Sequence, residues 1–193
     1  MATMSPAARP RPRIYFGYYL VAIALVCQFV TAGAQAYVSG VFLGPMTHDL
    51  GWTRAQYASG QSIGAFVMAF AGFFIGAQVD RGRARPLMVL GATVFGASLM
   101  LTAEITQYWQ WVVLRGFTLT LGAALMGNLV VNVILSKWWV ERRGRVVGIS
   151  SMGVSLAGVI LPTMTWVVGR VGWQDGWIIL GLAAWVLIFP ARC

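Results

Sequence analysis

Long apolar runs alternate with short polar or charged segments along the whole chain. Setting the charged positions aside leaves six runs, at residues 14–47, 55–79, 86–103, 105–136, 146–169 and 176–191. A helix that crosses a bilayer needs ~20 residues, so the first five runs are long enough and the sixth is short. The pattern predicts an all-α membrane protein with six transmembrane helices, at about residues 15–42, 56–79, 86–104, 108–136, 146–169 and 174–191.

Composition excludes a soluble globular domain. The chain is 59% hydrophobic and 10% charged, whereas soluble domains have about 25% charged residues. Residues 1–13 are polar and rich in Pro, Ala and Arg, and we expect a cytoplasmic basic tail there. A cleaved signal peptide would have an apolar segment of only ~7–15 residues, which is far shorter than the first run.

The basic residues predict the orientation of the helices. Of the 14 Lys and Arg residues, Arg54 and Arg170 fall on one side of the predicted bundle and Arg115 falls inside a run. All others lie in the tail, in two loops on the opposite side, or at the end of the chain. Cytoplasmic segments carry this excess, so we expect both termini inside, in the plasma membrane or a bacterial inner membrane. The net charge of +9 therefore reflects topology, and no nucleic-acid partner is expected.

Polar side chains inside the apolar runs are candidates for lining a cavity. Lipid cannot satisfy such groups, so they face other helices or a water-filled space. The amide candidates are Gln28, Gln35, Gln61, Asn128 and Asn132. The alternative for these amides is interhelical hydrogen bonding alone.

Arg115 is the strongest of the intramembrane candidates. A charge within a bilayer costs at least ~2.5 kcal/mol and marks a functional site by default. We expect Arg115 to bind an anionic group or to take part in proton coupling. The alternative is that it extends to the outer interface, because it follows closely after Trp109.

Small residues recur on one side of two predicted helices. Gly60, Gly64, Gly72 and Gly76 are spaced by multiples of four on the second helix, and the fifth carries Ser151, Ser155, Gly158 and Pro162. Such stripes allow a neighbouring helix to approach closely, so both predict helix–helix contacts.

The sequence offers no catalytic cluster. The single histidine, His48, stands beside Asp49 in a predicted outer loop, and no group of His, Cys and carboxylates accompanies it. We therefore expect neither an enzyme nor a cofactor or metal site. A six-helix channel or a structural membrane protein remains the alternative to a transporter, although a channel would be expected to have a filter or re-entrant loop.

The segment GAQVDRGRARP, residues 76–86, joins the second and third predicted helices. A charged turn that only fixes topology is one interpretation. The spacing Gly76-x-x-x-Asp80-Arg81, followed by Arg85, resembles the loop signature between the second and third helices of the major facilitator superfamily. Arg83 stands where that signature has glycine, and Gly82 comes one residue early. The resemblance implies that Gly76, Asp80, Arg81 and Arg85 form a conformational gating motif.

Three further segments carry the same resemblance. Arg115-Gly116 with Gly122 is similar to the fourth-helix motif of the superfamily. LGWTRAQ (50–56) and KWWVERRGRVVGI (137–149) resemble segments of its monocarboxylate and oxalate/formate branch, and the second places Glu141, Arg142, Arg143 and Arg145 in a cytoplasmic loop.

Members of this superfamily have twelve helices in two halves, each built from inverted three-helix repeats. The resemblance implies that residues 14–191 form the first half and that the second half is absent from this chain. The implied function is secondary transport of a small organic solute such as a monocarboxylate, with a proton or counter-anion as a possible coupling partner. Self-association or a second transporter half would complete the protein.

Overall fold

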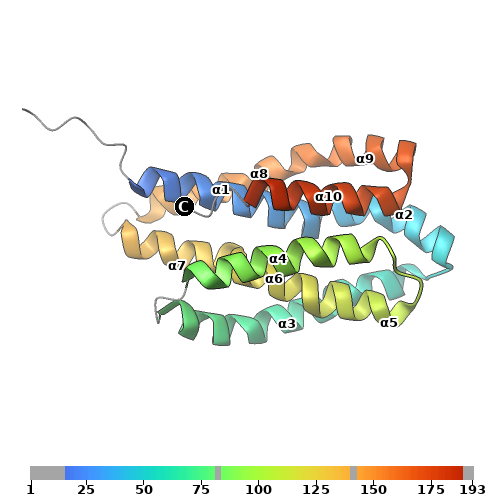
Figure 1. Cartoon of the computed structure of the whole chain (residues 1–193), viewed down its shortest axis with the longest axis horizontal. Coiled ribbons are helices and arrows are strands. Elements are labelled where there is room, and N and C mark those ends of the chain that lie inside the picture. Colours follow the sequence, from blue (N-terminus) through green and yellow to red (C-terminus); the bar gives the residue numbers. More distant parts are fainter. Residues whose placement is uncertain (1–15, 81–83, 140–142, 189–193) are drawn as a thin grey trace, which may run out of the picture.

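The computed structural model describes residues 16–80, 84–139 and 143–188. Within these ranges the regular structure is helical, and the helices lie side by side along the longest axis of the molecule (Figure 1). Three short segments of different winding, a π-helix η1, a second π-helix η2 and a 3₁₀ helix η3, interrupt the α-helices. In chain order the elements are α1 (Phe16–Ala32), η1 (Gly33–Tyr37), α2 (Val38–Leu50), α3 (Arg54–Asp80), α4 (Ala84–Thr102), α5 (Tyr108–Trp111), η2 (Val112–Thr118), α6 (Leu119–Met126), α7 (Asn128–Trp138), α8 (Arg143–Leu156), η3 (Ala157–Val159), α9 (Ile160–Val171) and α10 (Trp173–Ile188).

Several of these elements join end to end into longer helices. We call α1–η1–α2 helix 1, α3 helix 2, α4 helix 3, α5–η2–α6–α7 helix 4, α8–η3–α9 helix 5 and α10 helix 6. Four segments of the described chain are long and apolar enough to cross a membrane: Tyr19–Leu50, Arg54–Val79, Tyr108–Ser136 and Arg143–Val171. Helices 3 and 6 are shorter apolar helices. The all-helical fold with long apolar helices fits the predicted membrane protein, whereas six spans and cytoplasmic termini stay predictions.

The helix ends are sorted between the two ends of the bundle. The start of α1, the end of α3, the start of α4, the end of α7 and the start of α8 gather at one end (Figure 1). The connections from α2 to α3, α4 to α5 and α9 to α10 lie at the other. The helix ends that flank the predicted basic loops therefore lie together, which is the arrangement that the charge pattern requires.

One predicted loop is helical. His48 and Asp49 belong to the last turn of α2, so the prediction that they lie in a loop is wrong, whereas their position on the outer side stays a prediction. The helix continues to Leu50 and ends at Gly51, whose backbone has φ 66° and ψ 23°. Glycine adopts this left-handed conformation without steric cost and is the usual residue that ends a helix.

The core is closely packed where helix 3 crosses helix 4. A Cβ atom added to Gly122 would lie 2.8 Å from the backbone nitrogen of Phe95, so a glycine is needed for the two backbones to approach this closely. Phe42 of helix 1 stacks on Trp177 of helix 6 with ring centroids 4.2 Å apart, and both side chains are fully buried. These contacts belong to one buried core to which helices 1, 3, 4 and 6 contribute.

The two small-residue stripes differ in their surroundings. On helix 2, Gly60 lies against Trp111 and Gly64 against Thr120, so the predicted contact with another helix is confirmed at these positions. On helix 5, Ser151, Ser155 and Pro162 are exposed. The described part of the chain leaves this second stripe largely uncovered, and its helix–helix contact stays a prediction.

Candidate functional site

The candidate site is centred on Arg115, and two π-helical segments contribute to it. η1 interrupts helix 1 and η2 interrupts helix 4. The wider turn leaves backbone carbonyls that need other donors, and such bulges occur frequently at functional sites. The hydroxyls of Thr118 in η2 and Thr120 in α6 donate to the carbonyls of Val113 and Arg115, five residues earlier, at 3.1 and 3.0 Å. Side-chain donors therefore sustain the altered winding.

Arg115 of η2 connects the two π-helical segments. Its guanidinium donates to the carbonyl of Gln35 at 2.8 Å and to that of Ala34 at 3.4 Å, both in η1. It also donates to the hydroxyl of Ser39, which in turn donates to the Gln35 carbonyl at 2.7 Å. Arg115 is 3% exposed, so the alternative that it extends to the outer interface is wrong.

Two aromatic side chains extend this network to helix 2. The hydroxyl of Tyr57 donates to the backbone carbonyl of Ser39 at 2.8 Å, and the indole of Trp111 donates to the carbonyl of Tyr57 at 3.0 Å. The Tyr57 and Trp111 rings are stacked with centroids 4.7 Å apart. Gly60 makes room for Trp111, because an added Cβ would lie 2.7 Å from its indole nitrogen. Helices 1, 2 and 4 are thus joined by buried hydrogen bonds around Arg115.

The charge of Arg115 is surrounded by neutral groups. Its Cζ atom lies 5.8 Å from the ring centroid of Trp111 and 5.9 Å from that of Trp177, within reach of weak cation–π attraction. Among the residues that the structure describes, the only ion pair is between His48 and Asp49, so no carboxylate neutralises Arg115 there. A guanidinium stays protonated at any physiological pH. The interior of the bundle therefore carries a net positive charge at this point.

The amide candidates are distributed differently from Arg115. Gln28 is buried on α1, Gln35 is half-buried in η1, and Asn132 is half-buried on α7. Gln61 is exposed on α3. Asn128 begins α7, and its side chain lies outside the described part. Gln35 joins the Arg115 network through its backbone carbonyl.

The charged-loop candidates lie largely outside the described residues. This holds for Arg81, Glu141 and Arg142 and for the side chains of Asp80 and Arg85. Gly76 is half-buried, and an added Cβ would meet no atom within 4 Å. Arg143 and Arg145 are exposed in the first turn of α8. The gating role of this motif stays a prediction.

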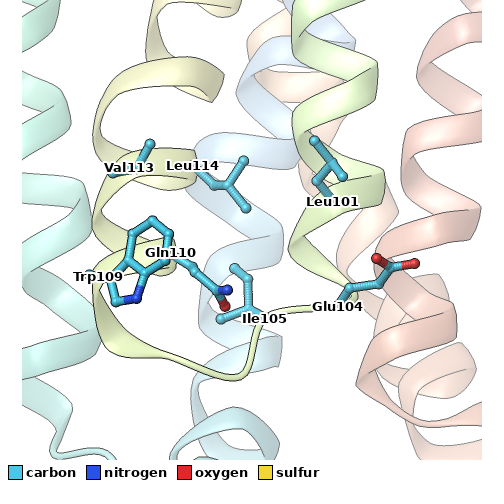
Figure 2. Close-up of a pocket in the computed structure, with 7 residues that line it drawn as sticks. All are labelled: Leu101, Glu104, Ile105, Trp109, Gln110, Val113 and Leu114. Carbon is cyan, nitrogen blue, oxygen red and sulfur yellow. The ribbon is translucent and has the colours of Figure 1, made fainter.

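A separate shallow pocket of about 280 Å³ lies where α4 is followed by α5 and η2 (Figure 2). Its walls are mostly apolar, and Glu104 is the only charged residue that lines it. The lining residues are Leu101, Glu104, Ile105, Trp109, Gln110, Val113 and Leu114. None of the predicted site residues belongs to this pocket. Within the described ranges, no group of His, Cys, Asp and Glu is arranged to hold a metal ion.

Apolar helices of membrane-spanning length, with a charge held inside the bundle, define a polytopic membrane protein. The family model for the Major Facilitator Superfamily matches residues 11–192. The chain belongs to the Major Facilitator Superfamily, and it is accordingly an integral membrane protein of a transporter family.

Several fungal transporters are similar to this chain. The MFS-type transporter dbaD of Emericella nidulans is 30% identical over 142 residues, which cover 73% of this chain and 30% of that protein. The MFS-type transporter pytF of Aspergillus terreus is 24% identical over 174 residues, covering 90% and 56%. The Fujikurins efflux protein of Gibberella fujikuroi is 32% identical over 114 residues, covering 58% and 24%. The chain thus spans between about a quarter and somewhat more than half of the length of these three relatives.

Proposed function

We propose that this chain forms the first six-helix bundle of a secondary active transporter. The bundle spans the membrane six times with its N-terminus in the cytoplasm. It acts together with a second bundle, and the two rock against each other to expose a central site alternately to each side of the membrane. The transported solute is a small organic molecule such as a monocarboxylate.

The observation that supports this proposal best is the buried Arg115 network. A charge in the membrane interior is costly and is retained where a protein handles ions or polar solutes. Arg115 binds η1 and is placed close to Tyr57 and Trp177, so helices 1, 2, 4 and 6 meet around one cation. The positive charge favours an anionic solute or a counter-anion as the coupled species.

The uncovered face of helix 5 supports the participation of a second bundle. Gly144 and Gly148 have no atom within 4 Å of an added Cβ, and Ser151, Ser155 and Pro162 are exposed. Close packing of small residues is a main source of helix association inside membranes, where no hydrophobic driving force acts. A second bundle that packs on this face would use the stripe as its contact.

Uptake into liposomes tests the transport proposal. The chain is reconstituted alone and joined to a second six-helix bundle of the same family, and uptake of radiolabelled lactate is followed against an unlabelled lactate gradient. We expect saturable uptake that counterflow accelerates, only when both bundles are present. A flux that rises in proportion to lactate concentration without saturation would favour the channel alternative.

A matched pair of arginine variants separates a role in transport from other effects. Arg170 lies near the end of α9, where its Cζ is 5.3 Å from the ring centroid of Trp166. Arg170→Ala is the control for loss of a cation elsewhere in the protein. We expect both Arg115→Ala and Arg115→Lys to abolish uptake. Alanine removes the charge, and lysine lacks the planar guanidinium that donates to two acceptors at once. Uptake unchanged by Arg115→Ala would show that this residue only joins the helices.

Thiol labelling tests the proposed orientation. In a variant with both native cysteines replaced, His48→Cys is expected to react with an impermeant reagent from outside intact cells. Its side chain is 90% exposed at the end of α2. Arg145→Cys, exposed at the start of α8, is expected to react only after the membrane is opened. The reversed pattern would contradict a cytoplasmic N-terminus.

A further inference from the structure

Trp177 carries a buried hydrogen-bond donor that the Arg115 network does not use. Its side chain is fully buried on α10, and its indole nitrogen has no hydrogen-bond partner among the described residues. Two other buried indole donors, by contrast, are paired: Trp111 with the Tyr57 carbonyl and Trp173 with Asp49. Leaving a buried N–H unpaired is energetically costly, so an acceptor at this position has an energetic benefit.

The positive charge of Arg115 lies beside the ring that carries this donor. Its Cζ atom lies 5.9 Å from the Trp177 ring centroid. The three acceptors of the guanidinium are two carbonyl oxygens and one hydroxyl oxygen. A guanidinium has five N–H donors, so it has capacity for a further acceptor.

Helix 1 holds the indole in place. Phe42 stacks on Trp177 with an interplanar angle of 21°. A Cβ atom added to the preceding residue, Gly176, would lie 3.0 Å from the Phe42 ring. The donor is therefore fixed by packing and does not need to be ordered when a ligand binds. Such preorganisation reduces the entropic cost of binding.

We propose that Arg115 and Trp177 together bind a small monovalent anion, a halide or the carboxylate of a small solute. The anion accepts a hydrogen bond from the indole N–H and neutralises the guanidinium, which has no other counter-ion among the described residues. The site lies between helices 1, 4 and 6, and neither Arg115 nor Trp177 lines the pocket beside Glu104. Identifying the anion with the transported solute rests on the proposed function, whereas the binding itself does not.

Thermal unfolding of the purified chain in detergent tests anion binding directly. Sodium gluconate, whose anion is bulky, is replaced stepwise by sodium chloride or sodium acetate at constant ionic strength. A ligand that binds only the folded state raises the free energy of unfolding by RT ln(1 + [L]/Kd), where [L] is the concentration of the free ligand. We expect the unfolding midpoint to rise by about 3–8 °C with increasing chloride or acetate.

Two tryptophan variants make the test specific. Trp177→Phe removes the N–H and keeps an aromatic ring against Phe42, and it is expected to abolish most of the rise. Trp166→Phe is the same exchange at an exposed position of α9 and is expected to keep the full rise. Arg115→Lys keeps the positive charge but lacks the planar guanidinium, and it is expected to retain a smaller part of the rise in the unfolding midpoint.

The outcomes separate the sources of the anion and the two proposals. A rise with chloride alone identifies a halide site and removes the solute carboxylate as the ligand. An anion effect that Trp177→Phe retains in full, or none in the unmodified chain, would overturn the site and leave water as the acceptor for the indole. Anion binding without lactate uptake would uphold this inference while the proposed substrate fails.

Discussion

Helices 4 and 5 have the same apolar character but opposite surroundings. Both contain a 29-residue segment suitable for crossing a membrane, at Tyr108–Ser136 and Arg143–Val171. Each segment contains an apolar stretch of 18 residues. In helix 4, 62% of this stretch is buried within the protein, whereas in helix 5 only 22% is buried. Apolar length therefore predicts that a segment is a membrane helix, but it does not tell a central helix from a peripheral one.

Polar and small residues account for the difference between the two helices. Helix 4 places Arg115 against helix 1 and Gly122 against helix 3. Helix 5 contacts α1 on one side. There, a Cβ atom added to Gly153 would lie 3.1 Å from the Cβ of Gln28. Its opposite side carries the uncovered stripe. Helix 4 is consequently the centre of this bundle, and helix 5 has a face free for a further contact.

The largest effect is expected from removing the charge at the centre of helix 4. Arg115→Met removes the hydrogen bonds to the Ser39 hydroxyl and to the carbonyls of Ala34 and Gln35, although the Gln35 carbonyl keeps the Ser39 hydroxyl as a donor. Hydrogen bonds from charged groups contribute about 1.5–3 kcal/mol each. Because removal of a buried charge offsets part of this, the net loss is expected to be about 3 kcal/mol. Unfolding in detergent with increasing denaturant measures it, with Arg170→Met as the control. Equal stability of the two variants would mean that the network does not hold helix 4 in place.

A glycine pair sharpens the comparison at intermediate magnitude. Gly122→Ala places a methyl group 2.8 Å from the Phe95 nitrogen, and overpacking of this kind costs about 1–3 kcal/mol. Gly148→Ala on helix 5 meets nothing within 4 Å and is expected to stabilise the bundle by about 0.5–1 kcal/mol. Thermal unfolding is expected to show a lower midpoint for Gly122→Ala and a higher midpoint for Gly148→Ala. Destabilisation by Gly148→Ala in the isolated chain would show that helix 5 is packed on this side as well.

The smallest effect is expected at the link between helices 1 and 2. Tyr57→Phe removes the hydrogen bond to the Ser39 carbonyl and keeps the ring stacked on Trp111. A single neutral hydrogen bond contributes about 0.5–1.5 kcal/mol. Ser59, whose hydroxyl lies 2.6 Å from that of Tyr108 at an exposed position, provides the control variant Ser59→Ala. If Ser59→Ala destabilises more than Tyr57→Phe, the buried link is not the stronger of the two.

Much of the helical framework follows from the sequence because bilayer-spanning helices must be long and apolar. The error at His48 arose because Thr47, His48 and Asp49 are polar, whereas the helix continues until Gly51 ends it. A polar segment at the end of a membrane helix remains helical when it reaches water, since its side chains are solvated there.

The candidate site was predictable only in part. Arg115 stands out because a charge interrupts an apolar run, and Ser39 is a polar residue within the first apolar run. Its other partners are main-chain carbonyls of η1, which every residue possesses and no sequence pattern marks. Tyr57, Trp111 and Trp177 are aromatic residues in or beside apolar runs, where such residues are ordinary core. Their roles depend on which helices become neighbours.

The central claim is that the uncovered face of helix 5 contacts a second bundle in the working transporter. A spin label at Ser155→Cys, in a bilayer, reports lipid contact through its collision rate with dissolved oxygen. We predict high oxygen accessibility for the chain alone and a marked decrease when a second six-helix bundle of the same family is joined to it. A label at Val186→Cys, exposed on α10, is predicted to stay accessible in both. Unchanged accessibility at residue 155 on addition of the second bundle would contradict the claim.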